Sequence, residues 1–204
     1  MPKLLQRKQH PLATAKGQMK VLDDYKAINI PSFESKLKSL GHSPLKPTKI
    51  DIFQINVGKM CNQVCAHCHV DAGPGRKEIM TRETMQLCLD ALEGTDISTI
   101  DLTGGAPEMN PNFRWFVEEL SKLGKNIIVR CNLTIILANK KYNDLPEFFK
   151  KHKINVVSSL PYFNAKRTDA QRGNGVFDKS IRALQMLNEV GYGKTESDLK
   201  LDLV

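Results

Sequence analysis

The chain has 204 residues, 41% of them hydrophobic and 25% charged, which is ordinary for a globular protein with one sizeable core. It contains no run that approaches the roughly 20 apolar residues of a membrane span, and no apolar secretory stretch near its start, so we predict a cytoplasmic protein without a membrane partner. The net charge of +8 comes almost entirely from residues 1–50, which carry 10 Lys and Arg against 3 Asp and Glu, and the remainder is nearly neutral. Because this basic segment is poor in the aromatic residues that would stack on bases, we predict no nucleic-acid partner.

The first 49 residues are predicted to form a basic N-terminal leader, a solvated arm that wraps the domain, and residues 50–204 to form the core domain. The core begins with Ile50–Val57, in which apolar and polar residues alternate over the length of a strand. Gly58 then opens a long loop that contains three of the five cysteines. Cysteines this close in sequence favour metal binding over a disulfide framework.

Beyond this loop, strand-like and helix-like segments alternate to the end of the chain. Thr81 is predicted to cap a helix that ends at Gly94. The last helix is predicted to present one apolar face, made of Phe177, Ile181, Leu184 and Leu187. The predicted strands are 50–57, 98–102, 126–130, 154–158 and 199–204, and the predicted helices are 81–94, 111–123, 146–152 and 177–190.

This alternation is typical of an α/β fold with a parallel sheet and helical crossovers. Polar and cysteine-rich segments follow the predicted strands, where parallel α/β folds place their sites. The chain ends on an apolar strand whose edge would remain unpaired. We therefore expect the sequence to be a fragment of a longer protein.

The most informative segment is Cys61–Cys68, a C-x3-C-x2-C set of three cysteines. Three thiolates suit one cubane iron–sulfur cluster and leave one iron with an open coordination position. The alternatives are a zinc site completed by His67 or His69, or three unrelated buried thiols. A zinc site usually repeats a C-x2-C pair elsewhere, which this chain lacks, so the pattern favours the cluster with Cys61, Cys65 and Cys68 as ligands.

The cysteine set after the first strand, with His67 just before its last cysteine, resembles the signature of the radical S-adenosylmethionine (SAM) superfamily. The resemblance implies a partial (β/α)6 barrel, here incomplete at the C-terminus, with a [4Fe-4S] cluster and SAM as cofactors. It also implies an electron donor such as flavodoxin or ferredoxin. His67 is carried over as a residue of the cofactor site.

A second match follows the second predicted strand, in Thr103–Glu108. The resemblance places SAM against the backbone of Gly104, Gly105 and Ala106, since glycine lets a backbone approach a ligand closely. Ala106 stands where the superfamily commonly has glutamate, which leaves the role of Glu108 open.

Further segments resemble the arsenosugar-biosynthesis radical SAM proteins. Asn132 and Ser159, which follow the third and fourth strands, are expected to contact the ribose or carboxylate of SAM, and Arg172 is an alternative partner for the carboxylate. The resemblance implies transfer of the 5′-deoxyadenosyl group to a small molecule, a methylated trivalent arsenical. The segments that carry it are 10–13, 54–58, 61–63, 67–74, 103–108, 130–134, 158–161 and 169–173.

Two other functional classes stay open at this point. A radical SAM enzyme could act on another substrate, such as a peptide. The chain could instead be a non-catalytic iron–sulfur or zinc module. Cys88 is expected to be a buried apolar-face thiol, and Cys131 to end a strand on the side of the active site.

Overall fold

The computed structural model describes residues 10–24 and 30–204. The chain divides into two compact units, one that ends at Ile50 and one that begins at Asp51. Within the described residues, no helix combines the length and the apolar character that a membrane span requires. The predicted domain boundary, between a leader of residues 1–49 and a core domain of residues 50–204, remains a prediction.

The described residues of the N-terminal unit, 10–24 and 30–50, include the short helices α1 (Ala15–Leu22) and α3 (Phe33–Ser39), which the sequence analysis did not identify. Each begins at a hydroxyl cap: Thr14 accepts a hydrogen bond from a backbone N–H of α1, and Ser32 accepts one from α3. Neither helix contains a buried residue. Their sequences therefore showed caps but too little apolar periodicity for a prediction.

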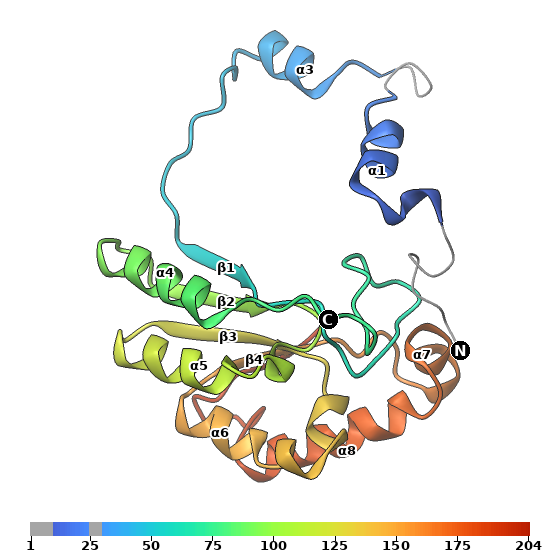
Figure 1. Cartoon of the computed structure of the whole chain (residues 1–204), viewed down its shortest axis with the longest axis vertical. Coiled ribbons are helices and arrows are strands. Elements are labelled where there is room, and N and C mark those ends of the chain that lie inside the picture. Colours follow the sequence, from blue (N-terminus) through green and yellow to red (C-terminus); the bar gives the residue numbers. More distant parts are fainter. Residues whose placement is uncertain (1–9, 25–29) are drawn as a thin grey trace. The chain divides into compact units, whose positions relative to one another are not determined.

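The core unit contains one sheet of five parallel strands in the order β1-β2-β3-β4-β5. Each strand pairs with the next one along the chain, as in a barrel wall built from successive strand and helix units (Figure 1). The predicted α/β class and partial barrel are confirmed. The strands are β1 Ile52–Asn56, β2 Thr99–Thr103, β3 Asn126–Cys131, β4 Asn155–Ser158 and β5 Leu201–Leu203.

Five helices connect the strands, and α4, α5 and α6 follow one another along the sheet in Figure 1. The predicted cap Thr81 and end Gly94 bound α4 as expected. The helices are α4 Arg82–Glu93, α5 Phe113–Lys122, α6 Leu145–Lys151, α7 Ala165–Arg172 and α8 Val176–Glu189. Short 3-10 helices lie at Pro11–Ala13 (η1), Pro107–Met109 (η2), Thr134–Leu137 (η3) and Lys140–Tyr142 (η4).

Two features of the last helices differ from the prediction. Helix α7 was missed because its sequence is almost entirely polar and has no apolar stripe; it begins at Asn164, whose side chain caps Arg167 N. Helix α8 is rotated relative to the predicted face, so Phe177, Ile181 and Leu184 are only half-buried. Its buried residues are Val176, Ser180, Ala183 and Leu187.

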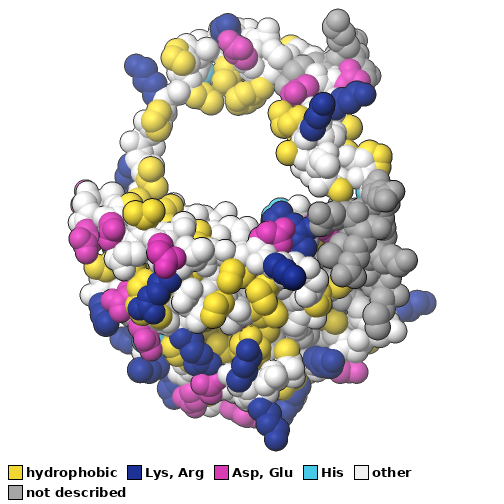
Figure 2. All heavy atoms as spheres, in the orientation of Figure 1, with side chains coloured by type: hydrophobic (Ala, Val, Ile, Leu, Met, Phe, Trp, Pro, Cys, Tyr) yellow, Lys and Arg dark blue, Asp and Glu magenta, His cyan; other side chains and the backbone are white. Residues whose placement is uncertain are grey.

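The core lies between the helices and one face of the sheet. Residues alternate in β3, where Ile127 and Val129 are buried and Arg130 is exposed. Phe113 and Phe116 of α5 are buried completely or nearly so, and burial of a side chain of this size contributes about 1.5–3 kcal/mol. Figure 2 shows Lys, Arg, Asp and Glu interspersed over the visible surface of the core unit, in keeping with its near-neutral composition.

The opposite face of the sheet carries a polar cluster. Arg130 donates two hydrogen bonds from Nε and Nη2 to the carboxylate of Asp101, at 3.0 and 2.8 Å, and Gln54 Nε2 donates to the same carboxylate at 2.7 Å. Gln54 and Asp101 are paired in register on β1 and β2. The buried carboxylate is thus fully neutralised by its neighbours.

Candidate functional site

The cysteine loop, residues 58–79, leaves the carboxyl end of β1 and returns to the same place. Its two arms pair with each other through Lys59 N to Glu78 O at 2.8 Å and Gly73 N to Lys59 O at 3.0 Å. Cys61 N donates to Gly73 O at 3.3 Å. The three cysteines therefore lie on one arm of a closed loop whose second arm supports them.

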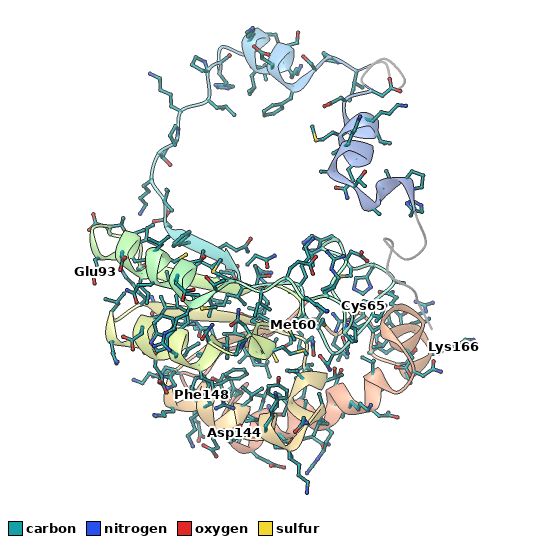
Figure 3. All side chains as sticks on the ribbon, viewed as in Figure 1. Met60, Cys65, Glu93, Asp144, Phe148 and Lys166 are labelled. Atoms are coloured by element: carbon teal, nitrogen blue, oxygen red, sulfur yellow. The ribbon has the colours of Figure 1, made fainter. Side chains whose placement is uncertain are left out.

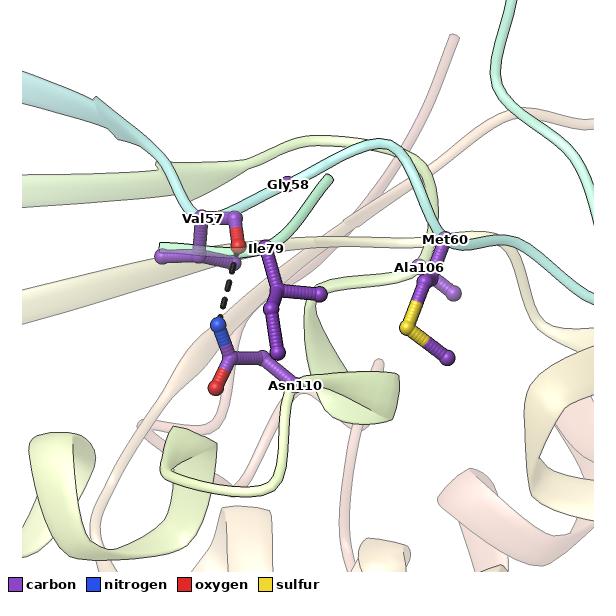
Figure 4. A pocket seen from close by; sticks show the side chains of 6 residues that line it. All are labelled: Val57, Gly58, Met60, Ile79, Ala106 and Asn110. Carbon is purple, nitrogen blue, oxygen red and sulfur yellow. Dashed lines mark hydrogen bonds between the residues drawn. The ribbon is translucent and has the colours of Figure 1, made fainter. Parts of the chain in front are cut away.

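Asn110 holds the base of the cysteine loop together. Its side-chain amide, which is buried, donates to Val57 O and to Met80 O, both at 2.9 Å. Figure 4 shows the first of these contacts beside a small pocket that Val57, Gly58 and Ile79 help to line. One side chain thus joins the points at which the chain enters and leaves the loop.

The glycine turn after β2 packs directly on the cysteine loop. Gly105 N donates to Gly58 O at 3.0 Å, and Ala106 N donates to Met60 O at 2.8 Å. A Cβ atom at Gly105 would collide with the carbonyl of Met60, and Gly104 has a φ of 147°, which side-chain-bearing residues rarely adopt. The sequence analysis attributed the glycines to a close approach of SAM. The structure shows that their lack of a side chain first allows the close approach of the cysteine loop.

Asn132, predicted as a SAM contact, is engaged with the cysteine loop. Its Nδ2 donates to Asn62 Oδ1 at 2.8 Å and lies 3.4 Å from Cys61 Sγ. Thr134 Oγ1 accepts from the amides of Asn62 and Gln63 at 2.9 and 2.8 Å. The loop after β3 therefore holds Cys61 in place through side-chain hydrogen bonds to Cys61 and the two residues that follow it.

The backbone between Asn132 and Thr134 is strained. Leu133 has φ 58° and ψ −54°, and Thr134 N donates to Asn132 O at 2.6 Å, which closes a three-residue γ-turn of the rare kind. A residue in such a conformation costs about 1–3 kcal/mol and persists where its surroundings impose it. The turn directs both flanking polar side chains at the cysteine loop. Sequence reasoning missed Asn62, Gln63 and Thr134, although their polar side chains next to Cys61 and Asn132 were a visible signal.

The sulfur atoms receive hydrogen bonds from the protein. Gln63 N lies 3.4 Å from Cys61 Sγ, and Ala72 N lies 3.3 Å from Cys68 Sγ. Burial raises the pKa of the Cys61 thiol to about 11, although the hydrogen bonds from Gln63 N and Asn132 partly oppose the shift. Burial likewise raises the pKa of Cys65. The thiols of Cys61 and Cys65 are therefore protonated at neutral pH in the metal-free protein, and metal binding would displace their protons.

The second arm of the loop is braced by ion pairs. Arg76 contacts Asp71 at 3.3 Å and Glu78 at 2.6 Å. Asp71 has a φ of 52°, in the left-handed region. The ion pairs hold the bend that brings Ala72 N to the sulfur of Cys68.

The remaining predicted residues lie at the same edge of the sheet with different surroundings. His67 lies on the cysteine loop and is largely exposed, and the partial desolvation of its ring together with the nearby charge of Arg172 lowers its pKa. Ser159 is half-buried just after β4. Cys131 is buried on the helix-covered face. Cys88 is half-buried in α4.

The three thiols fit a cluster by their chemistry and mutual influence. Cys65 and Cys68 both raise the pKa of Cys61, so the thiols lie within range of one another's charge. All three are soft sulfur donors, as iron–sulfur ligands are, and N–H groups donate to the sulfurs of Cys61 and Cys68. In the part of the chain that the structure describes, no three His, Cys, Asp or Glu side chains are gathered closely enough to hold a single metal ion.

Comparisons of the sequence identify relatives. The family model described as the radical SAM superfamily matches residues 55–199. The chain is 28% identical over 132 residues to the antilisterial bacteriocin subtilosin biosynthesis protein AlbA of Bacillus subtilis, covering 64% of this chain and 29% of that protein. It is 30% identical over 142 residues to the mycofactocin maturase MftC of Mycobacterium tuberculosis, covering 65% and 33%. The chain thus spans about a third of the length of these relatives.

Solved structures share the fold. Streptococcus suis SuiB superposes with a TM-score of 0.59 at 20% identity, covering 95% of this chain and 48% of that chain. SuiB bound to S-adenosylmethionine superposes with a TM-score of 0.58 at 18% identity, covering 89% and 45%.

Proposed function

Because the chain belongs to the radical SAM superfamily, whose members are enzymes that generate a 5′-deoxyadenosyl radical, we propose that it is the cluster-binding part of such an enzyme and that Cys61, Cys65 and Cys68 hold a [4Fe-4S] cluster. One observation carries the proposal: three thiols on one loop at the carboxyl edge of the sheet, with N–H donors on the sulfurs of Cys61 and Cys68. When bound, the cluster supplies the electron that cleaves SAM to methionine and the 5′-deoxyadenosyl radical.

The protein's own residues prepare this site. Asn132 and the backbone N–H of Gln63 direct positive dipoles at Cys61 Sγ, and Ala72 N does so at Cys68 Sγ, which favours the thiolate forms. Asn110 and the glycine turn fix the loop against the sheet. The cysteines are therefore presented on a backbone that the surrounding residues support.

SAM is proposed to bind at this edge, against Gly104, Gly105 and Ala106 and within reach of His67, Asn132 and Ser159. The support is placement, because every one of these residues follows the carboxyl end of a strand or lies on the cysteine loop. Asn132 would act mainly by holding Asn62 and Cys61, to which it is already hydrogen-bonded.

Reconstitution tests the cluster proposal. The protein, reconstituted anaerobically with iron and sulfide, should become brown and bind about four irons per chain. With a reductant and SAM it should release 5′-deoxyadenosine. A colourless protein that binds zinc and no iron would show that the chain is a zinc module.

A methylated trivalent arsenical is our proposed substrate, to which the enzyme would add the 5′-deoxyadenosyl group in arsenosugar biosynthesis. The support is the resemblance of the cysteine loop, the glycine turn and the segments after β3 and β4 to the arsenosugar-biosynthesis proteins. Physically, the lone pair of a soft trivalent arsenic atom can form an As–C5′ bond with a primary carbon radical. The odd electron left on arsenic would return to the oxidised cluster, which would give a pentavalent arsenical product. SAM would then be consumed as a co-substrate.

A peptide is the second candidate substrate. It is favoured by the relatives, since one is named for bacteriocin biosynthesis and SuiB has been solved with a precursor peptide.

The electron donor is proposed to be a flavodoxin or ferredoxin, and the compartment the cytoplasm.

Labelled substrate distinguishes the two substrate classes. The reconstituted enzyme, incubated anaerobically with SAM, reductant and a methyl-deuterated trivalent arsenical, should yield an arsenic-containing nucleoside in the mass spectrum. Arsenic should be attached to C5′, and 5′-deoxyadenosine should carry no deuterium. Deuterium in 5′-deoxyadenosine, with no arsenical nucleoside, would contradict the arsenical proposal and leave the cluster unaffected.

A further inference from the structure

Arg172, the last residue of α7, is a buried cation with incomplete pairing. Only 8% of the residue is exposed, and its Nε and Nη1 atoms have no hydrogen-bond partner among residues 10–24 and 30–204. A buried guanidinium without a counter-charge costs several kcal/mol. Its position therefore calls for an anion that belongs to the working protein.

The end of α7 is fixed against the cysteine loop. Ala66 N, between Cys65 and Cys68, donates to Gln171 O at 2.8 Å, so the residue before Arg172 is joined to the loop. Asp169 accepts hydrogen bonds from Gly175 N at 2.7 Å and Phe177 N at 2.9 Å, which locks the turn into α8. Arg172 lies between these two anchors.

The charge of Arg172 reaches the cysteine loop. The hydrogen bond from Ala66 N to Gln171 O ties the residue after Cys65 to the residue before Arg172. Figure 3 shows Cys65 on the loop next to α7, on which Lys166 is labelled at the solvent side.

We propose that Arg172 supplies a fixed positive charge beside the Cys65 corner of the cluster and thereby raises the cluster's reduction potential. The inference rests on the proposed function, since it requires that Cys65 is a cluster ligand. A cluster with three thiolate ligands becomes more negative by one charge when it accepts an electron. A buried cation nearby stabilises that reduced state more than the oxidised one, because attraction grows with the charge and is weakly screened in the interior. Arg172 thus acts on the cluster only through its charge, as a positioning residue, and touches no reacting atom.

A redox titration of the reconstituted protein without SAM tests the proposal. We compare Arg172→Gln, which removes the charge, with Arg172→Lys, which keeps it. Lys166→Gln is the matched control, because it removes a positive charge from the exposed side of the same helix. In Arg172→Gln the ratio of reduced to oxidised cluster at a given potential should fall at least tenfold, equal to a shift of about 59 mV for one electron. Arg172→Lys and Lys166→Gln should remain near the wild-type potential.

The outcomes separate this proposal from the proposed function. An unchanged potential in Arg172→Gln, or an equal shift in Lys166→Gln, would overturn the role of Arg172 while the cluster itself stands. An unchanged potential together with weaker SAM binding would assign Arg172 to the SAM carboxylate instead, which also overturns it. If Arg172→Gln assembles no cluster, Arg172→Lys decides: a wild-type potential supports the proposal, and a shifted potential or no cluster overturns it. Failure of the wild-type protein to bind iron would contradict the proposed function.

Discussion

The helix-covered face of the sheet and the edge that carries the cysteine loop are stabilised in different ways. On the covered face, Ile100, Val129 and Phe116 are completely buried among apolar side chains. At the edge, the buried side chains include Gln63 and Asn132, and each is held by specific hydrogen bonds. Apolar contacts are numerous and undirected, whereas the hydrogen bonds are few and directional.

This difference predicts different consequences for single substitutions. A change on the covered face should lower the free energy of unfolding and leave the affinity for iron intact in the molecules that fold. A change at the edge should weaken the affinity for iron and have little effect on the free energy of unfolding. The predictions below test this separation, beginning with the largest expected effect.

Removal of one thiolate should abolish the cluster. Cys61→Ala, Cys65→Ala and Cys68→Ala each leave only two protein ligands for a cubane, so reconstituted protein should lose its iron and its brown colour. The metal-free variants should remain folded, since an ordinary substitution costs about 1 kcal/mol. Cys88→Ala, in α4, is the control and should bind iron normally. Full iron content with normal SAM cleavage in any of the three would refute the ligand assignment.

Truncation of Phe116 should produce the opposite result. Phe116→Ala removes a completely buried ring of α5 and should lower the free energy of unfolding by about 3–5 kcal/mol, measured by urea denaturation of the metal-free protein. Iron per folded chain should be unchanged. Leu87→Ala, at an exposed position of α4, should cost less than about 0.5 kcal/mol. Loss of iron from folded Phe116→Ala would show that the two regions are coupled.

The same difference explains what the sequence could predict. Alternation in Ile50–Val57 and the cap at Thr81 identified β1 and α4, because local patterns report burial directly. Helix α7 carried no such pattern, since it is held by caps and by contacts with a distant loop. The buried face of α8 was misplaced because Ser180 and Ala183 are not recognisable as core residues from their type alone.

The site could be predicted only in part for a related reason. Spacing identified the three cysteines as a set, and partners distant in sequence, such as Asn132, were assigned by resemblance. Asn132 donates to the loop and Thr134 accepts from it, and these hydrogen bonds join residues about 70 positions apart, so no local pattern contains them. The placement of Gly105 against Met60 likewise depends on how two loops meet after folding.

Glu108 is a polar residue within the apolar region and should give stability a distinctive pH dependence. Burial raises its pKa from 4.5 to about 7, and neither carboxyl oxygen has a partner with hydrogen-bonding geometry among the described residues, although Cys131 lies nearby. The folded state therefore prefers the neutral carboxyl. This contribution is fully present below pH 4.5 and is lost as the pH rises through about 7.

Glu108→Gln should remove this dependence. One unit of pKa shift is worth about 1.4 kcal/mol, so the variant should gain roughly 2 to 3 kcal/mol relative to the wild type between pH 5 and pH 8. Urea denaturation at the two pH values gives the free energy of unfolding of both metal-free proteins. The difference between variant and wild type cancels the titration of all other groups. An equal pH dependence in both proteins would show that Glu108 ionises normally in the folded state.

Loss of the Thr134 hydroxyl should have the smallest effect on stability and a specific effect on the site. Thr134→Val keeps the volume of the side chain but leaves the amides of Asn62 and Gln63 without their shared acceptor. A buried donor left unpaired costs about 1–3 kcal/mol, and part of this is recovered if the amides turn towards water. We expect a loss of about 1 kcal/mol in urea denaturation.

The cluster should be affected more than the fold, because the freed amides no longer hold the backbone around Cys61. Reconstituted Thr134→Val should lose iron to a chelator faster than the wild type. Thr134→Ser retains the hydroxyl, and it should release iron at the wild-type rate even though it lacks the methyl group. If Thr134→Ser released iron as fast as Thr134→Val, the methyl group and its packing would account for the effect, and the edge would depend on apolar contacts just as the covered face does.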